Sequence, residues 1–148
     1  MRPAHHAAAG LAGGAGVLLL TGSVGAALAF ALVSVLLDLD HVADYLAFGV
    51  PPRTVHKFFT PGHSGIWGRT VFLLHSHELL LTLLLFWAAG APPLWAKASI
   101  VGLAGHLALD EWGNRRRAFH LRLPALYYFF LYRLARGFRG EALLIPKY

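Results

Sequence analysis

The stretch that decides the fold is residues 7–37, AAAGLAGGAGVLLLTGSVGAALAFALVSVLL. As one helix this stretch would be about 46 Å long at about 1.5 Å per residue, longer than the roughly 30 Å hydrocarbon core of a bilayer. Residues 21–25, TGSVG, are a turn signal within it, and Ser23 is placed to cap a new helix. We therefore predict two helices, about 4–20 and 23–37, in a tight hairpin, because Gly and Ala let helices approach closely in lipid. One long span is the alternative.

The composition indicates an integral membrane protein. Of 148 residues, 57% are hydrophobic and only 14% are charged, whereas a soluble domain usually has about 25% charged residues. Further apolar blocks predict helices at about 71–89 and 93–112, and the aromatic segment 124–136 predicts an interfacial or packed helix. We expect a single all-α domain, 1–148: a polytopic membrane helical bundle of about four transmembrane helices plus that C-terminal helix. A signal peptide is outlined by Arg2 and by ALA at 27–29, but the apolar run is too long for one.

The charges predict an orientation. With the hairpin first, every one of the 13 Lys and Arg residues except Lys97 falls on one side, which the positive-inside rule makes the cytoplasm. We expect a multi-pass protein of the inner (plasma) membrane with a cytoplasmic C-terminus. The net charge of +6 does not indicate nucleic-acid binding, because the basic residues flank apolar segments. The chain has no cysteine, which excludes a thiolate nucleophile or ligand.

Acidic and histidine residues gather in three clusters, each at the cytoplasmic end of an apolar block. The spacings place pairs on one helix face: His75 and Glu78 are i,i+3, and His106 and Asp110 are i,i+4. Imidazoles and carboxylates that converge from several helices are how bundles build metal sites. Nitrogen and oxygen ligands suit one or two divalent ions, Zn²⁺ first, with Mn²⁺ or Fe²⁺ as alternatives. The expected metal ligands are Asp38, Asp40, His41, His75, His77, His106 and Asp110.

Each cluster by itself also fits a simpler interpretation. The DLDH segment at 38–41 can be a helix end in water, and HSHE at 75–78 can be a proton relay or a polar packing group. The pair His106 and Asp110 can be a buried hydrogen bond. Because all three clusters are predicted at the same depth in the membrane, the metal site is favoured over these separate interpretations.

The same residues resemble a known family. An N-terminal histidine (His5 or His6), the segment Leu37–His41 and the segment Gly102–Asp110 are similar to motifs of the YdjM-like proteins, which are described as membrane-bound, metal-dependent hydrolases of the inner membrane. Leucine stands here where that family has proline before Asp38, and LLHSHELLL departs from the family's middle motif. The resemblance covers roughly residues 5–114 and implies a divergent member with a metal-dependent hydrolytic activity.

These observations predict a metal-dependent hydrolase that acts on a phosphoester of a membrane lipid or lipid-linked substrate. Glu78 and Asp110 are the expected catalytic residues, with Glu78 as a general base or a further ligand. Arg69, Arg115 and Arg116 are expected to bind the substrate phosphate. A homo-oligomer is left open. The rival hypothesis is a non-catalytic membrane protein: a divalent-ion or proton carrier, or a metal-binding subunit of a membrane complex.

Overall fold

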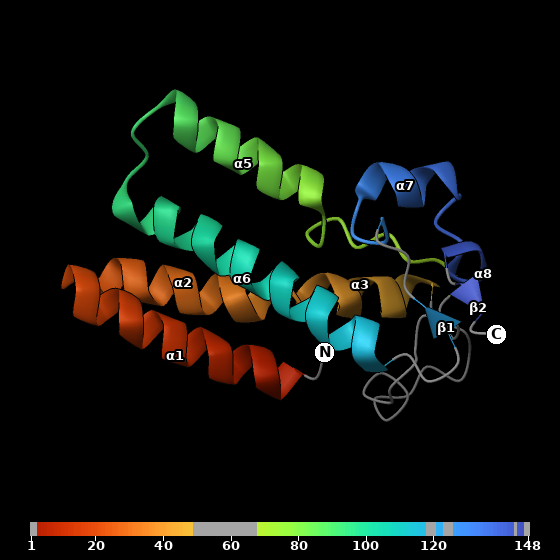
Figure 1. Cartoon of the computed structure of the whole chain (residues 1–148), viewed down its shortest axis with the longest axis horizontal. Coiled ribbons are helices and arrows are strands. Elements are labelled where there is room, and N and C mark those ends of the chain that lie inside the picture. Colours follow the sequence, from red (N-terminus) through yellow and green to blue (C-terminus); the bar gives the residue numbers. More distant parts are fainter. Residues whose placement is uncertain (1–2, 49–67, 118–120, 123–125, 144, 147–148) are drawn as a thin grey trace. The chain divides into compact units, whose positions relative to one another are not determined.

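The computed structural model describes residues 3–48, 68–117, 121–122, 126–143 and 145–146. The described chain is almost entirely α-helical (Figure 1), as the sequence predicts, with one short antiparallel strand pair. It divides into two compact units, Met1–Asp38 with Glu78–Asp110, and Leu39–His77 with Glu111–Tyr148. The elements are α1 (Pro3–Thr21), α2 (Val24–Leu36), α3 (Leu39–Phe48), α5 (His77–Ala89), α6 (Leu94–Arg117), α7 (Phe130–Ala135), α8 (Gly140–Leu143), β1 (Leu121–Arg122) and β2 (Ile145–Pro146).

The predicted hairpin of α1 and α2 is present in the first unit. Gly22 follows α1 with a φ of 65°, a left-handed conformation that glycine adopts without strain at the end of a helix. Ser23 then caps α2, because its backbone is extended and its Oγ accepts a hydrogen bond from the amide of Ala26 at 3.2 Å. The chain therefore reverses within two residues, and α1 lies along α2 (Figure 1).

Glycines let three helices of the first unit pack closely. A Cβ atom at Gly13 of α1 would lie 2.2 Å from the ring of Phe30 in α2, and one at Gly102 of α6 would lie 2.9 Å from the Phe30 carbonyl oxygen. A Cβ at Gly10 would lie 3.1 Å from Cβ of Ser34, and one at Gly102 would lie 3.2 Å from its Oγ. Larger residues would force the helices apart, so Ser34 sits between α1 and α6 because both present glycine there.

Several predicted boundaries differ from the structure. Helix α5 begins at His77 rather than at 71, because backbone amides of the preceding segment donate to side-chain carboxylates, that of Phe72 to Asp44 and that of Leu74 to Asp40. Helix α6 continues to Arg117, beyond the predicted end at 112. Helix α7 covers only Phe130–Ala135 of the predicted 124–136; residues 123–125 lie outside the described residues. Helix α3 was not predicted as an element of its own.

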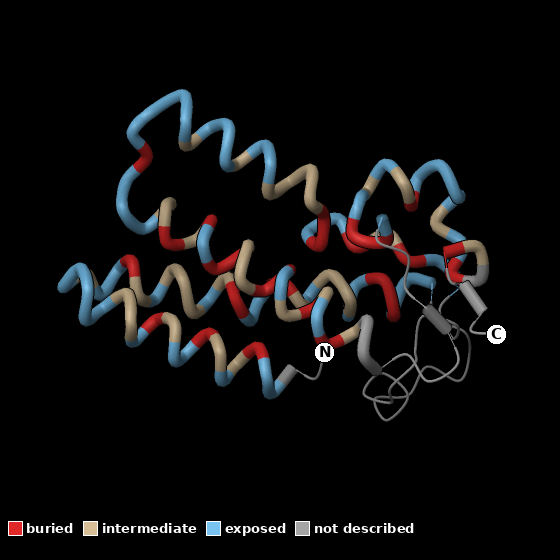
Figure 2. The backbone as a smooth tube through the Cα atoms, viewed as in Figure 1, coloured by how far each residue is buried: buried red, intermediate tan, exposed pale blue. Residues whose placement is uncertain are grey.

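Apolar side chains are extensively exposed on the first unit. Helix α5 has no buried residue (Figure 2), and Leu85 and Phe86 on it are 61% and 63% exposed. Among the described residues, one helical segment, Val24–Phe48 near the N-terminus, is long and apolar enough to cross a membrane by length and composition. Helix α5 is apolar but shorter, at 13 residues. The four-span topology, its orientation and the single-domain organisation stay predictions.

Candidate metal centre

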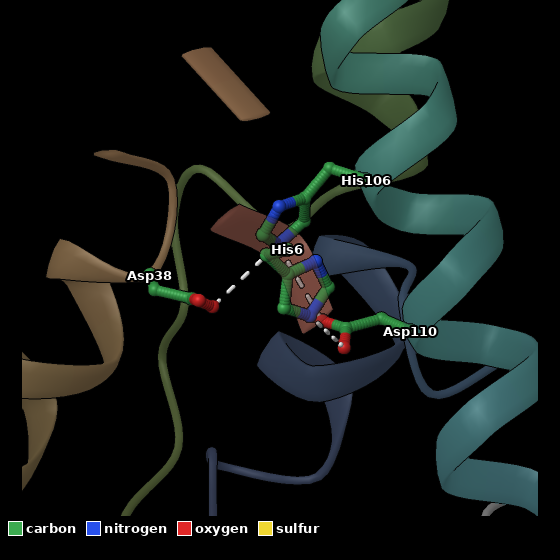
Figure 3. A group of neighbouring side chains, drawn as sticks. All are labelled: His6, Asp38, His106 and Asp110. Carbon is green, nitrogen blue, oxygen red and sulfur yellow. Dashed lines mark hydrogen bonds and ion pairs between the residues drawn. The ribbon is translucent and has the colours of Figure 1, made fainter. Parts of the chain in front are cut away.

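Four side chains that can hold a metal ion meet in the first unit (Figure 3). His6 comes from α1, Asp38 follows the end of α2, and His106 and Asp110 lie one turn apart on α6. One candidate ligand atom from each residue can be chosen so that all lie within 4.8 Å of one another.

The close helix packing explains why these residues meet. Residues four apart lie on the same face of a helix. His6 is four residues before Gly10, Asp38 is four after Ser34, and His106 is four after Gly102. These three candidate ligands are therefore one turn beyond the point where the helices pack against Ser34, and Asp110 is one turn further along α6.

The separations match a metal coordination shell. Nε2 of His6 lies 3.0 Å from Oδ1 of Asp110, and Nε2 of His106 lies 3.6 Å from both Oδ2 of Asp110 and Oδ1 of Asp38. In a tetrahedral zinc site with bonds of about 2.1 Å, ligand atoms are about 3.4 Å apart. The two imidazole rings stack with centroids 4.0 Å apart and planes inclined by 23°.

The hydrogen bond of His106 to the backbone decides which ring nitrogen faces the site. Nδ1 of His106 lies 2.8 Å from the carbonyl oxygen of Ser34, which only accepts, so Nδ1 carries the proton. Nε2 is then the ring nitrogen that faces the carboxylates of Asp38 and Asp110, each at 3.6 Å. A backbone acceptor on the far nitrogen is also the usual way in which a metal-binding histidine is oriented.

The centre is largely closed to solvent. His6, His106 and Asp110 are each 1% exposed, while the side chain of Asp38 is 21% exposed and forms the open side. The Nδ1 atom of His6 is buried and has no hydrogen-bond partner among the described residues. A cavity of about 40 Å³ borders both imidazoles; it is lined by His6, Ala9, Phe30, Ser34, Gly105, His106 and Leu109.

Asp38, His106 and Asp110 of the predicted ligand set are thus brought together. His6 was missing from that set, although the predicted hairpin placed His5 and His6 at the depth of the three clusters and the resemblance pointed to an N-terminal histidine, without choosing between the two. The structure chooses His6, because His5 is exposed on α1.

Three other predicted ligands lie close together in the second unit. Oδ1 of Asp40 lies 2.9 Å from Nδ1 of His41 and 2.8 Å from Nδ1 of His75. Oδ2 of the same carboxylate accepts the backbone amides of Leu74 and His75 at 2.9 and 3.2 Å. The predicted i,i+3 helix face of His75 and Glu78 is wrong, because His75 precedes α5 and is held by Asp40 instead.

The remaining predicted residues lie elsewhere. Nε2 of His77, the first residue of α5, pairs with Oε1 of Glu111 at 2.9 Å in the second unit. Glu78 is half-buried in the first turn of α5, and Arg69 is exposed. The side chains of Arg115 and Arg116 lie outside the described residues. The roles assigned to these residues stay predictions.

Comparisons with protein-family models, with curated proteins and with solved structures found no match for this chain. The resemblance to the YdjM-like proteins therefore stays a prediction.

Proposed function

We propose that the protein is an integral membrane, metal-dependent hydrolase that cleaves a phosphoester of a lipid or another membrane-associated substrate at the cytoplasmic interface. One divalent ion, Zn²⁺ in the first instance, binds His6, Asp38, His106 and Asp110. A bound divalent ion lowers the pKa of a coordinated water to about 7 and so supplies a nucleophile at neutral pH.

The observation that supports the ion best is the orientation of His106. Its Nε2 atom faces two carboxylates at 3.6 Å, in a pocket where His106 and Asp110 are 1% exposed. Imidazole nitrogens and carboxylate oxygens that converge in this way are the ligands that Zn²⁺ takes in proteins. A divalent cation among them would be bound by nitrogen and oxygen together.

The cavity beside the imidazoles supports a catalytic role for that ion. A catalytic zinc keeps a coordination position for water, whereas a structural zinc is closed by four protein ligands. A water molecule needs roughly 10–15 Å³ of cavity, so the 40 Å³ beside His6 and His106 can hold more than one. Asp38 and Asp110 do not line this cavity, so the space for water lies beside the imidazoles and not beside the carboxylates.

The exposed apolar surface supports the membrane location. Leu19 and Leu20 at the end of α1 are 87% and 88% exposed, and Leu28 and Leu32 on α2 are 56% and 53% exposed. Exposed apolar surface on this scale marks membrane or protein contact. With the Val24–Phe48 segment and the one-sided distribution of Lys and Arg, it favours a multi-pass inner-membrane protein whose C-terminus is cytoplasmic.

A second candidate function is a non-catalytic metal-binding subunit or ion carrier. It is favoured by the number of protein ligands, because His6, Asp38, His106 and Asp110 suffice to fill a tetrahedral shell without water. The two functions differ in whether metal binding is accompanied by hydrolysis.

The test combines metal analysis of the purified full chain with a screen of lipid phosphoesters, each with and without a chelator. Asp110→Asn is the test variant, and Glu111→Gln, which removes a carboxylate that is not among the four candidate ligands, is the matched control. We expect bound divalent metal and hydrolysis that are lost with chelator and in Asp110→Asn but kept in Glu111→Gln. Bound metal without hydrolysis, together with ion transport in proteoliposomes, would favour the second candidate. Absence of bound metal would refute both functions.

A further inference from the structure

Helix α7, in the second unit, buries its charged residue and exposes its leucines. Arg133 is completely buried, and its guanidinium donates to the backbone carbonyls of Tyr127, Phe72 and His75 at 2.8, 2.9 and 3.0 Å. Leu131 and Leu134 are three residues apart, so they share a face of α7, and they are 63% and 51% exposed (Figure 2). A helix whose outer face meets water is expected to expose charge and to bury leucine. The exposed face of α7 therefore fits contact with an apolar medium.

Two exposed arginines, Arg69 and Arg139, lie directly opposite each other in an isolated antiparallel bridge beyond α7. The left-handed backbone of Gly137 and Phe138, with φ values of 63° and 58°, turns the chain before Arg139. The amide of Thr70 then donates to the carbonyl of Phe138 at 2.8 Å, which holds the pairing. Opposed side chains of an antiparallel pair project from the same face with Cβ atoms about 4.5–5.5 Å apart, and like charges there destabilise the pair. A bound anion would relieve this repulsion.

A third exposed arginine, Arg136, follows α7 in the same turn, and its carbonyl accepts the amide of Arg139 at 3.4 Å. Its Nη1 donates to the carbonyl of Ala142 at 2.9 Å, and its guanidinium carbon lies 4.9 Å from the ring centroid of Tyr132. A guanidinium has five N–H donors, so donors remain for an anion. Among the described residues, no carboxylate pairs with Arg69, Arg136 or Arg139. We call these three residues the arginine group.

We propose that the arginine group and the exposed face of α7 dock on anionic phospholipids of the membrane: the arginines bind headgroup phosphate, and Leu131 and Leu134 contact acyl chains. Arginine binds phosphate with two parallel hydrogen bonds, and basic clusters beside an apolar helix face are typical of proteins that bind anionic lipid surfaces. A nucleic acid would also satisfy the arginines but would leave the leucines in water.

The inference rests on the membrane location in the proposed function and goes beyond it. The four candidate metal ligands all belong to the first unit, whereas the arginine group and α7 belong to the second. Lipid docking and metal binding can therefore be measured separately.

The experiment measures lipid binding to the purified full chain in a non-ionic detergent by native mass spectrometry. Phosphatidylglycerol is the anionic probe, and phosphatidylcholine with the same acyl chains is the zwitterionic probe. The variants are Arg69→Gln and Arg139→Gln. Lys97→Gln is the matched control, because it removes one positive charge from α6 in the first unit. Inorganic phosphate and a short single-stranded DNA are added as competitors.

We expect wild type and Lys97→Gln to bind phosphatidylglycerol more tightly than phosphatidylcholine. Each arginine substitution should weaken phosphatidylglycerol binding about fivefold, which corresponds to about 1 kcal/mol for one basic residue at an anionic surface, and leave phosphatidylcholine binding unchanged. Equal affinity of wild type for the two lipids, or unchanged phosphatidylglycerol binding in both arginine variants, would overturn the proposal. Displacement of the lipid by equimolar inorganic phosphate would mean an adventitious ion only, and displacement by DNA would mean a nucleic-acid site; either result overturns it.

Thermal unfolding separates loss of the lipid site from loss of the fold. With phosphatidylcholine, Arg139→Gln should unfold at the wild-type Tm or above it, because the substitution removes the repulsion between opposed arginines. Phosphatidylglycerol should raise the Tm of wild type and not that of the variant. A Tm below that of wild type in both Arg69→Gln and Arg139→Gln with phosphatidylcholine would make the pair a structural contact and overturn the proposal.

Failure of this inference is distinct from failure of the proposed function. A chain that binds metal and hydrolyses a phosphoester but does not prefer phosphatidylglycerol keeps the proposed function and overturns the inference. A chain that prefers phosphatidylglycerol through its arginines but binds no metal keeps the inference and overturns the proposed function.

Discussion

Asp110→Asn is the substitution that tests the metal site most directly. The carboxylate contacts both imidazoles, with Oδ1 3.0 Å from Nε2 of His6 and Oδ2 3.6 Å from Nε2 of His106. Asparagine keeps the shape of the 1% exposed side chain but removes the negative charge and replaces one oxygen by an amide nitrogen. Loss of an outer-shell partner costs about 10–100-fold in metal affinity. Removal of a ligand itself should lower the metal affinity by at least the upper figure, so we expect Asp110→Asn to bind the ion at least about 100-fold more weakly.

This loss converts into a change of thermal stability. At a free Zn²⁺ concentration 100 times the wild-type Kd, binding stabilises the folded protein by about 2.7 kcal/mol. At the same concentration a variant with 100-fold weaker affinity gains only about 0.4 kcal/mol. For a chain of about 150 residues, 1 kcal/mol corresponds to about 2–4 °C in Tm. Chelation should therefore lower the Tm of wild type by about 5–11 °C and that of Asp110→Asn by about 1–2 °C.

The assay is thermal unfolding followed by circular dichroism in one detergent, with Zn²⁺ and then with excess chelator. Glu111→Gln is measured in parallel and should show the wild-type response, since Glu111 pairs with His77 and is not among the four candidate ligands. Equal responses to chelator in wild type and Asp110→Asn would refute the assignment of Asp110 as a ligand.

Three further predictions follow from the first unit. Ser23→Ala removes the cap of α2 and should cost about 1 kcal/mol of stability in thermal unfolding, with metal affinity unchanged. Gly102→Ala places a Cβ 2.9 Å from the carbonyl oxygen of Phe30, so α6 must shift away from α2, and calorimetry should show weaker metal binding. Gly105→Ala is the control: its added Cβ would meet no other atom within 4 Å, so this variant should bind metal as the wild type does. Metal affinity should fall as the pH is lowered, because nitrogen and oxygen ligands must be deprotonated to bind the ion; a flat pH profile in calorimetric titrations would argue against coordination by these side chains.

Part of the fold and of the candidate site follows from the sequence because it depends on local rules. The turn at Gly22 and Ser23 is set by a left-handed glycine and a serine cap, both visible in TGSVG. The pair His106 and Asp110 follows from helical spacing alone, since α6 is regular through both residues. Asp38 was predicted from its position after an apolar helix.

Other features depend on contacts between distant parts of the chain. The sequence predicts a helix that includes His75. In the structure, the carboxylates of Asp40 and Asp44 accept hydrogen bonds from backbone amides of the segment 70–76, and the helix starts at His77. The choice of His6 over His5 is made by the face of α1 that its glycines turn toward α2.

Arg133 shows most clearly how the folded structure differs from the prediction made from the sequence. By sequence alone it is a basic residue near an aromatic segment, which predicts a surface position. In the folded chain its guanidinium binds carbonyls of residues 72 and 75, some 60 positions earlier, and its side chain is fully buried. Local spacing determined the hairpin, the pair on α6 and the presence of metal-ligand residues. Tertiary structure decided which of these residues meet, because backbone groups without a local partner must find one elsewhere in the fold.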